Sequence, residues 1–362
     1  MRNFNKFRSF FVAATVAVSS FAFTSCDDDD DTPPVWLQDQ DGVFIINEGN
    51  FQTPNASISF LYDNADRTVL NDLFQKANGQ KPLGDVAMDL DLIGNQAYIT
   101  LNNSNKVEIV NAATFREEAV IENLKLPRFF TALNQDKAYI TEWVDYGEPG
   151  RVSVINLKTN QVVKSLTVGE QPEQLVIVGD KLYVANQVSN TVTIINTTTD
   201  AVEATVPVAD APNSLAVDAN NNVWVLSSGT KNYIAYPEID PAQSTAGALT
   251  KINGATGAIT STFNFPDVTA SAEDLTLNGA KNTLYYTYNG KVYKQETNAG
   301  SLSHTVIVDR SFYGIGIDPE TGYIYGAEQS FTGNGTVSVF RPDGTMVTSF
   351  TAGIGPNGFV FK

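Results

Sequence analysis

Short apolar strands recur along the chain at nearly even intervals, and each is centred on an aromatic residue. The intervals between successive aromatic positions are 41, 44, 41, 61 and 40 residues. A period in the low forties that is built of short β-runs is typical of a propeller blade with four strands. The six aromatic positions are Tyr98, Tyr139, Tyr183, Trp224, Tyr285 and Tyr325.

A second predicted strand follows each aromatic strand, as in "RVSVIN" at 151–156 and "TVTIIN" at 191–196. These strands alternate apolar and polar residues, which indicates half-buried antiparallel strands. The spacing from the aromatic residue to the second strand varies from 7 to 25 residues, whereas the spacing onward to the next aromatic stays between 31 and 36. Because the variation falls in one kind of loop, we expect these loops to share one face, which is usually the binding face.

The two ends of the chain complete each other. "GPNGFVFK" at 355–362 matches "QPEQLVIV" at 171–178, so the chain stops after the first strand of a repeat. The next two strands are found near the other end, around Phe44 and Ile58. Pairing the C-terminal strand with this N-terminal blade closes the ring and leaves no free edge. We therefore predict an all-β, seven-bladed β-propeller over residues 42–362, against the alternatives of an open solenoid or stacked sandwiches.

The first 25 residues have the pattern of a secretory signal peptide. Basic residues at positions 2, 6 and 8 precede an apolar stretch over residues 10–23. This 14-residue stretch is too short to span a bilayer of about 30 Å, which needs roughly 20 residues. We predict that residues 1–25 are removed and that residues 26–41 form a tether.

Cys26 is the only cysteine, and its place after Ser25 resembles a bacterial lipoprotein box. The resemblance implies that Cys26 carries the lipid, with palmitate among its acyl chains. The run Asp27–Asp31 that follows also resembles the signal by which certain Gram-negative gut bacteria export lipoproteins to the outer face of the outer membrane. We expect a surface-exposed protein held to the membrane through its lipid alone, with a periplasm-facing anchor as the alternative.

The charge balance argues against nucleic-acid binding. Residues 1–25 hold three of the 23 basic residues and none of the 40 acidic ones, so the remainder carries 20 more acidic than basic residues. A surplus of this size repels a phosphate backbone, and it promotes solubility and attracts cations.

Few residues are available for catalysis. His304 is the single histidine, which excludes histidine-rich metal sites and cysteine–histidine nucleophiles by count. A hydrolase that uses paired carboxylates stays open as an alternative. Its candidate acids on the variable face are Glu48, Glu142, Asp145, Glu148 and Glu328. We expect no enzyme, and we assign no catalytic residue, metal ligand or cofactor.

Amide and aromatic side chains dominate the predicted variable face. Aromatic rings give contact area at low entropic cost, and amides both donate and accept hydrogen bonds, which suits a bulky, weakly charged ligand rich in amide or hydroxyl groups. The predicted ligand contacts are Asn47, Glu48, Asn50, Phe51, Asn102, Trp143, Tyr146, Asn186, Gln187, Tyr233, Tyr236, Tyr313, Glu328 and Gln329.

The segments "INEGNF" at 46–51 and "NASISFLY" at 55–62, behind a lipoprotein box and an acidic tether, resemble surface lipoproteins with propellers of the YncE-like class. Within that class the chain resembles the BtuG family. The resemblance implies capture of cobalamin, vitamin B12, as a ligand and its transfer to a TonB-dependent outer-membrane transporter. A surface propeller for adhesion, or for binding glycan or protein, would use the same face. Genes for corrinoid transport or for polysaccharide use beside this one would distinguish the two.

Overall fold

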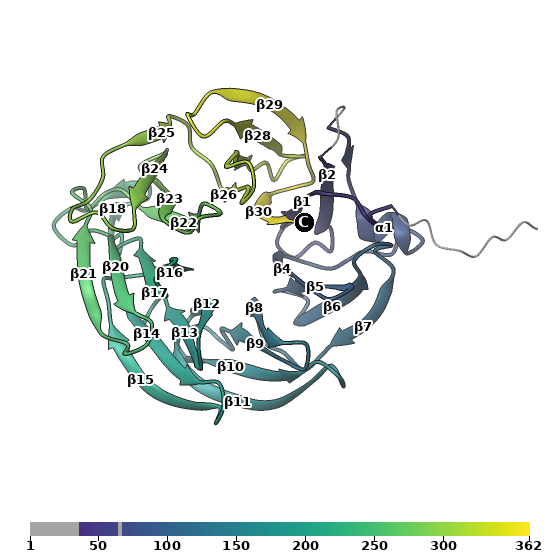
Figure 1. Cartoon of the computed structure of the whole chain (residues 1–362), viewed down its shortest axis with the longest axis horizontal. Helices are drawn as coiled ribbons and strands as arrows, with labels where there is room; N and C mark the ends of the chain where they lie inside the picture. Colours follow the sequence, from purple (N-terminus) through teal and green to yellow (C-terminus); the bar gives the residue numbers. More distant parts are fainter. Residues whose placement is uncertain (1–35, 64–66) are drawn as a thin grey trace, which may run out of the picture. The chain divides into compact units, whose positions relative to one another are not determined.

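The computed structural model describes residues 36–63 and 67–362. The described part is a single β-propeller, in which seven four-stranded antiparallel sheets surround a central channel (Figure 1). It belongs to the compact unit Pro33–Lys362. Cys26, the predicted signal peptide and the acidic run lie outside the described residues.

Each blade is one sheet whose first strand lies at the channel and whose fourth lies at the outside (Figure 1). Blade 1 contains β30 (Pro356–Phe361), β1 (Gly42–Asn47), β2 (Ser57–Tyr62) and β3 (Val69–Leu70). Blade 2 contains β4 (Ala87–Ile93), β5 (Gln96–Leu101), β6 (Lys106–Asn111) and β7 (Glu117–Ile121). Blade 3 contains β8 (Pro127–Asn134), β9 (Lys137–Glu142), β10 (Pro149–Asn156) and β11 (Gln161–Glu170).

The same order continues around the ring. Blade 4 contains β12 (Pro172–Val178), β13 (Lys181–Asn186), β14 (Thr191–Asn196) and β15 (Ala201–Pro207). Blade 5 contains β16 (Pro212–Val217), β17 (Asn222–Ser227), β20 (Ala248–Asn253) and β21 (Ile259–Asn264). Blade 6 contains β22 (Ala272–Leu277), β23 (Thr283–Tyr288), β24 (Lys291–Glu296) and β25 (Val306–Val308). Blade 7 contains β26 (Gly314–Ile317), β27 (Ile324–Glu328), β28 (Thr336–Phe340) and β29 (Met346–Thr351).

The ring closes as the sequence predicts. β30 pairs antiparallel with β1, so that Phe44 lies opposite Val360 and Ile45 opposite Phe359. The last strand of the chain is therefore the innermost strand of the blade that begins the propeller. This pairing joins the two ends of the propeller through backbone hydrogen bonds and leaves β1 without a free edge on the channel side.

The two middle strands of each blade are more buried than their alternating sequence suggests. In β14, Val192, Thr193 and Ile194 are all buried, although half-burial is the expectation for such a pattern. The reason is that a neighbouring blade covers each face of the sheet. The ring contact between Tyr98 of blade 2 and Phe130 of blade 3, with centroids 5.2 Å apart, is one of these inter-blade contacts. Polar residues of the middle strands can be buried in this way only where they have hydrogen-bonding partners inside the propeller. The outermost strand β15, in contrast, is exposed over most of its length.

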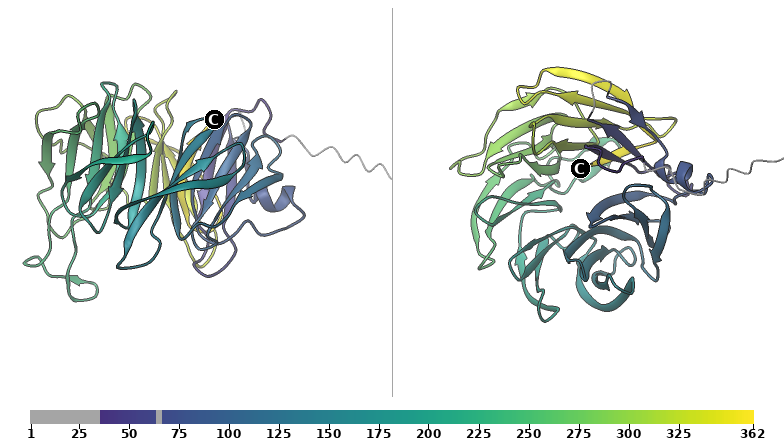
Figure 2. Two further views of the ribbon diagram at one scale, coloured as in Figure 1. Left: turned by 90° about the horizontal axis from the view of Figure 1, so that it is seen from below. Right: turned by 45° about the vertical axis from the view of Figure 1, so that its right-hand side comes forward.

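Two additions break the regular pattern. A short helix, α1 (Leu73–Ala77), follows blade 1 and buries Leu73 and Phe74. The hairpin of β18 (Tyr233–Ala235) and β19 (Glu238–Ile239) is inserted between β17 and β20 and accounts for the 61-residue interval. In the left view of Figure 2 it extends beyond the strands of its blade.

The variable loops and the start of the innermost strands lie on the same face. In blades 1 to 6, the residue directly after the second strand donates its backbone N–H to the carbonyl of the residue directly before the innermost strand. Examples are Trp143 to the carbonyl of Leu126, at 3.1 Å, and Gln187 to that of Gln171, at 2.9 Å. The loop tips therefore surround one mouth of the channel, which we call the variable mouth.

Candidate functional site: the variable mouth of the channel

The candidate site is the channel itself, a cavity of about 520 Å³ whose lining includes residues from all seven innermost strands or just before them. Seven of the lining residues occupy one equivalent position, the second residue of the innermost strand or its counterpart. Because the innermost strands run side by side around the axis, these side chains form one ring. The ring consists of Met88, Arg128, Glu173, Asn213, Glu273, Tyr313 and Asn357.

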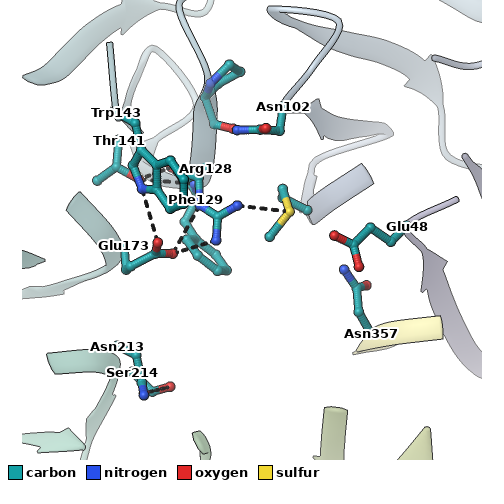
Figure 3. Close-up of polar contacts among 12 residues, drawn as sticks. Glu48, Asn102, Arg128, Phe129, Thr141, Trp143, Glu173, Asn213, Ser214 and Asn357 are labelled. Carbon is teal, nitrogen blue, oxygen red and sulfur yellow. Dashed lines mark hydrogen bonds and ion pairs between the residues drawn. The ribbon is translucent and has the colours of Figure 1, made fainter. Parts of the chain in front are cut away.

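A buried ion pair occupies one side of this ring. Arg128 donates from Nε and Nη2 to Oε2 of Glu173, at 3.1 and 2.9 Å. Trp143 donates from Nε1 to the other carboxylate oxygen at 3.0 Å, and the Arg128 guanidinium lies 4.4 Å from the centre of the Trp143 ring. Figure 3 shows the three side chains together. Two hydrogen bonds to one carboxylate oxygen and stacking on the Trp143 ring fix the guanidinium, so this side of the mouth is preorganised.

The electrostatics of the pair reflect its burial. The Glu173 side chain is 6% exposed and that of Arg128 is 16% exposed. Burial raises the pKa of the Glu173 carboxyl, while Arg128 and the Trp143 donor offset part of that shift. Arg128 Nη1 points toward the sulfur of Met88, at 3.2 Å. Since a thioether is a weak acceptor, Nη1 retains donor capacity for a ligand.

The other side of the channel, which we call the acidic side, carries Glu273 and Asp274 from β22. No described residue donates a hydrogen bond to Asp274, and its Oδ2 is buried without a partner. Burial raises the pKa of Asp274 well above its ordinary value, and the charge of Glu273 adds to the shift. Burial likewise raises the pKa of Glu273, partly offset by Lys231. Glu273 is exposed to the channel while protein surrounds it on the remaining sides.

Polar side chains elsewhere in the ring join neighbouring blades. Asn213 donates to the carbonyl of Ala272 at 3.0 Å, and Asn357 donates to that of Ala87 at 3.1 Å. The Asn357 amide lies near the carboxylate of Glu48 in Figure 3. Its Oδ1 is buried without a partner among the described residues. These amides hold the blades in register and leave acceptor atoms in the channel wall.

Asp89, one residue beyond the ring position, has a different environment. Its two carboxylate oxygens accept from the backbone N–H groups of Phe130 and Leu90, at 2.8 and 3.0 Å. Burial raises its pKa to about 7, and Asp91 adds to the shift, while the two backbone donors act against it. This carboxyl therefore stands close to its titration midpoint at neutral pH.

The structure brings four predicted contacts together at the channel. Trp143, Gln187 and Tyr313 line the cavity. Glu48 accepts a hydrogen bond from the Tyr313 hydroxyl at 2.8 Å, and burial raises the Glu48 pKa. Glu48, Trp143 and Gln187 come from the variable loops of blades 1, 3 and 4, which confirms only that those loops share one face, while Tyr313 lies just before β26.

Three predicted contacts lie inside the blades instead. Asn47 and Asn186 are fully buried, because they are the last residues of second strands and point into the sheet packing rather than toward the mouth. The Asn47 amide binds the hydroxyls of Ser57 and Ser59, and the Asn186 amide binds Thr193. Asn102 is also buried, and it donates to the carbonyl of Pro127 at 3.0 Å. Their amide groups serve the fold.

The remaining predicted residues lie on the variable loops, except Glu328, which is the last residue of β27, and Tyr233, which begins β18. Asn50 donates to the carbonyl of Phe331 at 2.7 Å, which joins the loops of blades 1 and 7. Glu328 pairs with Arg310 at 2.7 Å. The side chains exposed at loop tips are Phe51, Tyr146, Tyr233, Tyr236 and Gln329.

Sequence reasoning missed most of the channel ring. Arg128, Glu173, Asn213 and Asn357 each follow a proline at the start of an innermost strand. That repeated proline marks the turn into the strand, and the residue after it is the one that reaches the axis. The matching segments at 171–178 and 355–362 both contain this proline, but their similarity is used only to predict ring closure.

Two tests of the described residues bear on chemistry. No group of three or more His, Cys, Asp or Glu side chains in the described part is arranged to hold a metal ion. No helix in that part is long and apolar enough to cross a membrane.

Comparison with a family model decides the relationship of the chain. Residues 41–349 match the family described as "Domain of unknown function (DUF5074)". The chain belongs to the DUF5074 family. The match covers most of the propeller and ends before β30, so six of the seven ring residues lie within the DUF5074 domain and Asn357 lies beyond the match. No curated protein matches the chain.

Solved structures similar to this DUF5074 protein show the fold alone, because their sequence identities are low. A quinonprotein alcohol dehydrogenase-like protein from Bacteroides thetaiotaomicron has a TM-score of 0.65 at 16% identity, over 89% of this chain and 78% of that one. A Lactobacillus plantarum protein has a TM-score of 0.63 at 15% identity, over 89% and 99%. Hydrazine synthase of Kuenenia stuttgartiensis has a TM-score of 0.59 at 16% identity, over 75% and 88%.

Proposed function

We propose that this protein is a non-catalytic binding protein that captures a cobalamin-type corrinoid at the variable mouth. In this proposal Cys26 anchors it by lipid to the cell surface, and a TonB-dependent outer-membrane transporter receives the ligand. The observation that carries the proposal is the arrangement of aromatic side chains around a polar, amide-lined channel.

Three aromatic pairs lie on blades 3, 5 and 7, and the blade-5 pair belongs to the β18–β19 hairpin at the outer side of the ring (Figure 1). Their ring centroids are 5.6 Å apart in Trp143–Tyr146, 5.5 Å in Tyr233–Tyr236 and 6.0 Å in Tyr313–Phe331. Because the pairs alternate with other blades around the axis, they offer contact points on several sides of a broad ligand. A flat macrocycle edged with amide groups suits such a rim, with rings as anchors and amides as hydrogen-bonding partners.

The rim is fixed before any ligand arrives. The Trp143 ring is held by its bond to Glu173 and by Arg128, while Tyr313 is held by Glu48. Ordering the side chains in advance lowers the entropic cost of binding. This property supports capture of a scarce ligand, which is what the resemblance to surface corrinoid-binding lipoproteins implies.

The competing hydrolase has weaker support. Glu142 is buried, and its oxygens accept from Arg151 and Ser153, so it faces no substrate. Glu328 is paired with Arg310. Glu48 is the candidate acid nearest the channel, and Glu48→Gln tests this alternative, since a hydrolase that depends on it would lose turnover while a binding protein would show none to lose.

A surface protein that binds a macromolecule is the second candidate. The specific observation in its favour is the β18–β19 hairpin, where Tyr233, Ile234 and Tyr236 are exposed beyond the blade (Figure 2). If the hairpin binds a protein or glycan, Tyr236→Ala weakens that interaction, whereas Tyr146→Ala on blade 3 leaves it unaffected.

Calorimetry of the lipid-free chain from Asp27 onward, titrated with cyanocobalamin, tests the proposal. We expect saturable heat and a bound pink species, and a loss of roughly tenfold in affinity for Tyr146→Ala and for Phe51→Ala. Val163→Ala, an equally exposed apolar change on the outer strand β11, is the matched control and leaves affinity unchanged. Absence of heat and of bound colour at micromolar protein would refute the corrinoid function.

A further inference from the structure

The acidic side of the channel has a charge that the rest of the channel wall does not balance. Four carboxylates and one guanidinium line the cavity. The guanidinium, that of Arg128, is paired with Glu173, and the Asp89 carboxylate accepts from two backbone N–H groups. Glu273 and Asp274 are therefore the two carboxylates of the wall for which the described residues supply neither an ion pair nor a donor.

An irregularity in β22 brings these two carboxylates to the same surface. Successive side chains of a regular strand point to opposite faces of the sheet. The pairing register of β22 with β23 shifts between Glu273 and Thr276, and Asp274 has a φ of 56°. Such a bulge re-aims a side chain, and both acids line the cavity. The corresponding pairs of blades 2 and 4, Met88–Asp89 and Glu173–Gln174, contain one carboxylate each.

The oxygen atoms at the acidic side are acceptors that lack donors. No described residue donates a hydrogen bond to either carboxylate, and Oδ2 of Asp274 is buried in that state. Lys231, whose charge acts on Glu273, donates instead to the carbonyls of Ser228 and Thr245, at 2.9 and 3.2 Å. Burying an acceptor without a donor is costly. A ligand that supplies donors here therefore removes a cost that the protein alone does not offset.

Tyr313 of the neighbouring blade 7 adds a third acceptor. Its hydroxyl donates to Glu48 at 2.8 Å, which leaves the lone pairs of the oxygen free to accept. This hydroxyl lies within reach of the Asp274 charge: burial raises the Tyr313 pKa, and the charges of Glu48 and Asp274 add to the shift. A group that enters the channel between blades 6 and 7 therefore meets two carboxylates and a phenol oxygen.

From the paired carboxylates, the missing donors and the unbalanced charge, we infer that the acidic side of the channel binds the primary ammonium group of a small molecule. A primary ammonium has one positive charge and three N–H donors, which match the three acceptors. The channel, at about 520 Å³, has room for the rest of such a ligand. The inference goes beyond the corrinoid proposal and does not depend on it, because the amine is tested alone.

Three small probes separate charge from hydrogen bonding. n-Butylammonium has a charge and N–H donors, tetramethylammonium has the charge without the donors, and butyramide has N–H donors without the charge. Burial raises the pKa of both carboxyls, so the titrations are made at pH 8, where more of each is ionised than at neutral pH.

We expect n-butylammonium, titrated into the ²H,¹⁵N-labelled lipid-free chain, to shift the amide resonances of residues 272–276 and 313 in a saturable manner. Tetramethylammonium and butyramide should each bind about tenfold more weakly, because each lacks one part of a charge-assisted hydrogen bond.

The probes also give the results that would overturn the inference. Equal binding of tetramethylammonium would overturn the assignment to a primary ammonium, and equal binding of butyramide would overturn the assignment to a cation. No saturable shift at these residues up to about 50 mM n-butylammonium, a concentration that reveals even millimolar affinity, would overturn the site. Absence of cyanocobalamin binding by the same sample would refute the corrinoid function and leave the ammonium site standing.

Two variants locate the binding groups. Glu273→Gln and Asp274→Asn each remove one charge and keep the shape of the side chain, and we expect each to weaken n-butylammonium binding at pH 8 by about fivefold or more. Glu320→Gln makes the same change at an exposed position in the turn between β26 and β27. It alters the net charge equally and should leave the affinity unchanged. Unchanged affinity in Glu273→Gln or in Asp274→Asn, or an equal loss in Glu320→Gln, would contradict the inference.

Discussion

The two sides of the channel contain buried carboxylates in opposite situations. Glu173 of β12 receives two bonds from Arg128 and a third from Trp143. Asp274 of β22 receives none from the described residues, and Glu273 is its neighbour in place of a cation. The sequences at the two positions, "PEQ" and "AED", do not differ in a way that indicates this contrast.

The difference shows how adjacent positions of equivalent strands can serve two purposes, since Glu173 is the second residue of β12 and Asp274 the third residue of β22. A carboxylate bound to a guanidinium keeps its charge and orients its partner, so it builds a rigid wall. A carboxylate without donors gains a proton instead, since an isolated charge is costly to bury. The partnered side of the mouth is therefore fixed in shape, while the acidic side changes charge with pH or with a bound cation.

The largest expected effect comes from breaking the partnered side. Arg128→Met leaves Glu173 buried without its cation, and we expect the free energy of unfolding to fall by about 3–5 kcal/mol at pH 8. Urea unfolding followed by fluorescence measures it.

The double variant Arg128→Met/Glu173→Leu is the control for this change. Because it replaces the whole pair by apolar groups, we expect it to recover most of the lost stability. A double variant as unstable as the single one would show that packing of the arginine stem, and not the unpaired charge, causes the loss.

Asp89 provides an intermediate case, a carboxyl that is bound only by neutral backbone donors. Its pKa is raised from 3.8 to about 7, so the folded state binds a proton that the unfolded state has released between those values. Stability therefore falls as pH rises from about 4 to about 7. Lowering the pH from 8 to 5 should stabilise the protein by roughly 2–3 kcal/mol through this group.

Asp89→Asn tests this contribution, because it removes the titration and keeps one acceptor for the backbone. The gain in unfolding free energy between pH 8 and pH 5, measured by urea titration, should be smaller in Asp89→Asn than in the wild type by about 2 kcal/mol. Other carboxyls with raised pKa values contribute equally to both proteins. Identical gains would mean that Asp89 is ionised throughout this range.

Asp274→Asn should act in the direction opposite to Arg128→Met. The substitution keeps the shape and removes the cost of charging a carboxyl that has no donor. Asp274 has a φ of 56°, a left-handed conformation that asparagine tolerates as well as aspartate does. We expect an increase of about 1–2 kcal/mol in the free energy of unfolding at pH 8, and a smaller one at pH 5. A decrease at pH 8 would indicate that Asp274 has a stabilising partner.

The architecture could be predicted because it depends on periodic features. The spacing of Tyr98, Tyr139 and Tyr183 fixes the repeat, and the matching ends fix the closure, since strand pairing must remove both free edges. The shared face of the variable loops also follows from the repeat. These features depend on the backbone, and the backbone of a repeat protein is the same in each copy.

The channel could be predicted only in part, because its contacts join blades that are distant in sequence. Arg128 and Glu173 are 45 residues apart, and no pattern of period or composition indicates that they pair. Asn47 and Asn186 have the residue type expected at the rim, but each is the last residue of a second strand and its side chain points into the sheet packing. The direction of such a side chain can be predicted only when the exact end of the strand is known. Trp143 could be predicted because it is the first residue of a variable loop, whereas Tyr313 lies just before β26, where no variable loop marks it.

The smallest effect is expected from an ion pair outside the channel, and it tests whether burial is the cause of the contrast. Lys158 and Asp136 are 2.7 Å apart, like the channel pair, but their side chains are 68% and 59% exposed. Water and salt screen both charges, so Lys158→Ala should change the free energy of unfolding by less than about 0.5 kcal/mol. A loss near that of Arg128→Met would show that geometry alone sets the strength of these pairs. A negligible loss would show that Arg128→Met costs more than Lys158→Ala because Glu173 is little exposed. Low exposure is also the property that makes the channel wall rigid.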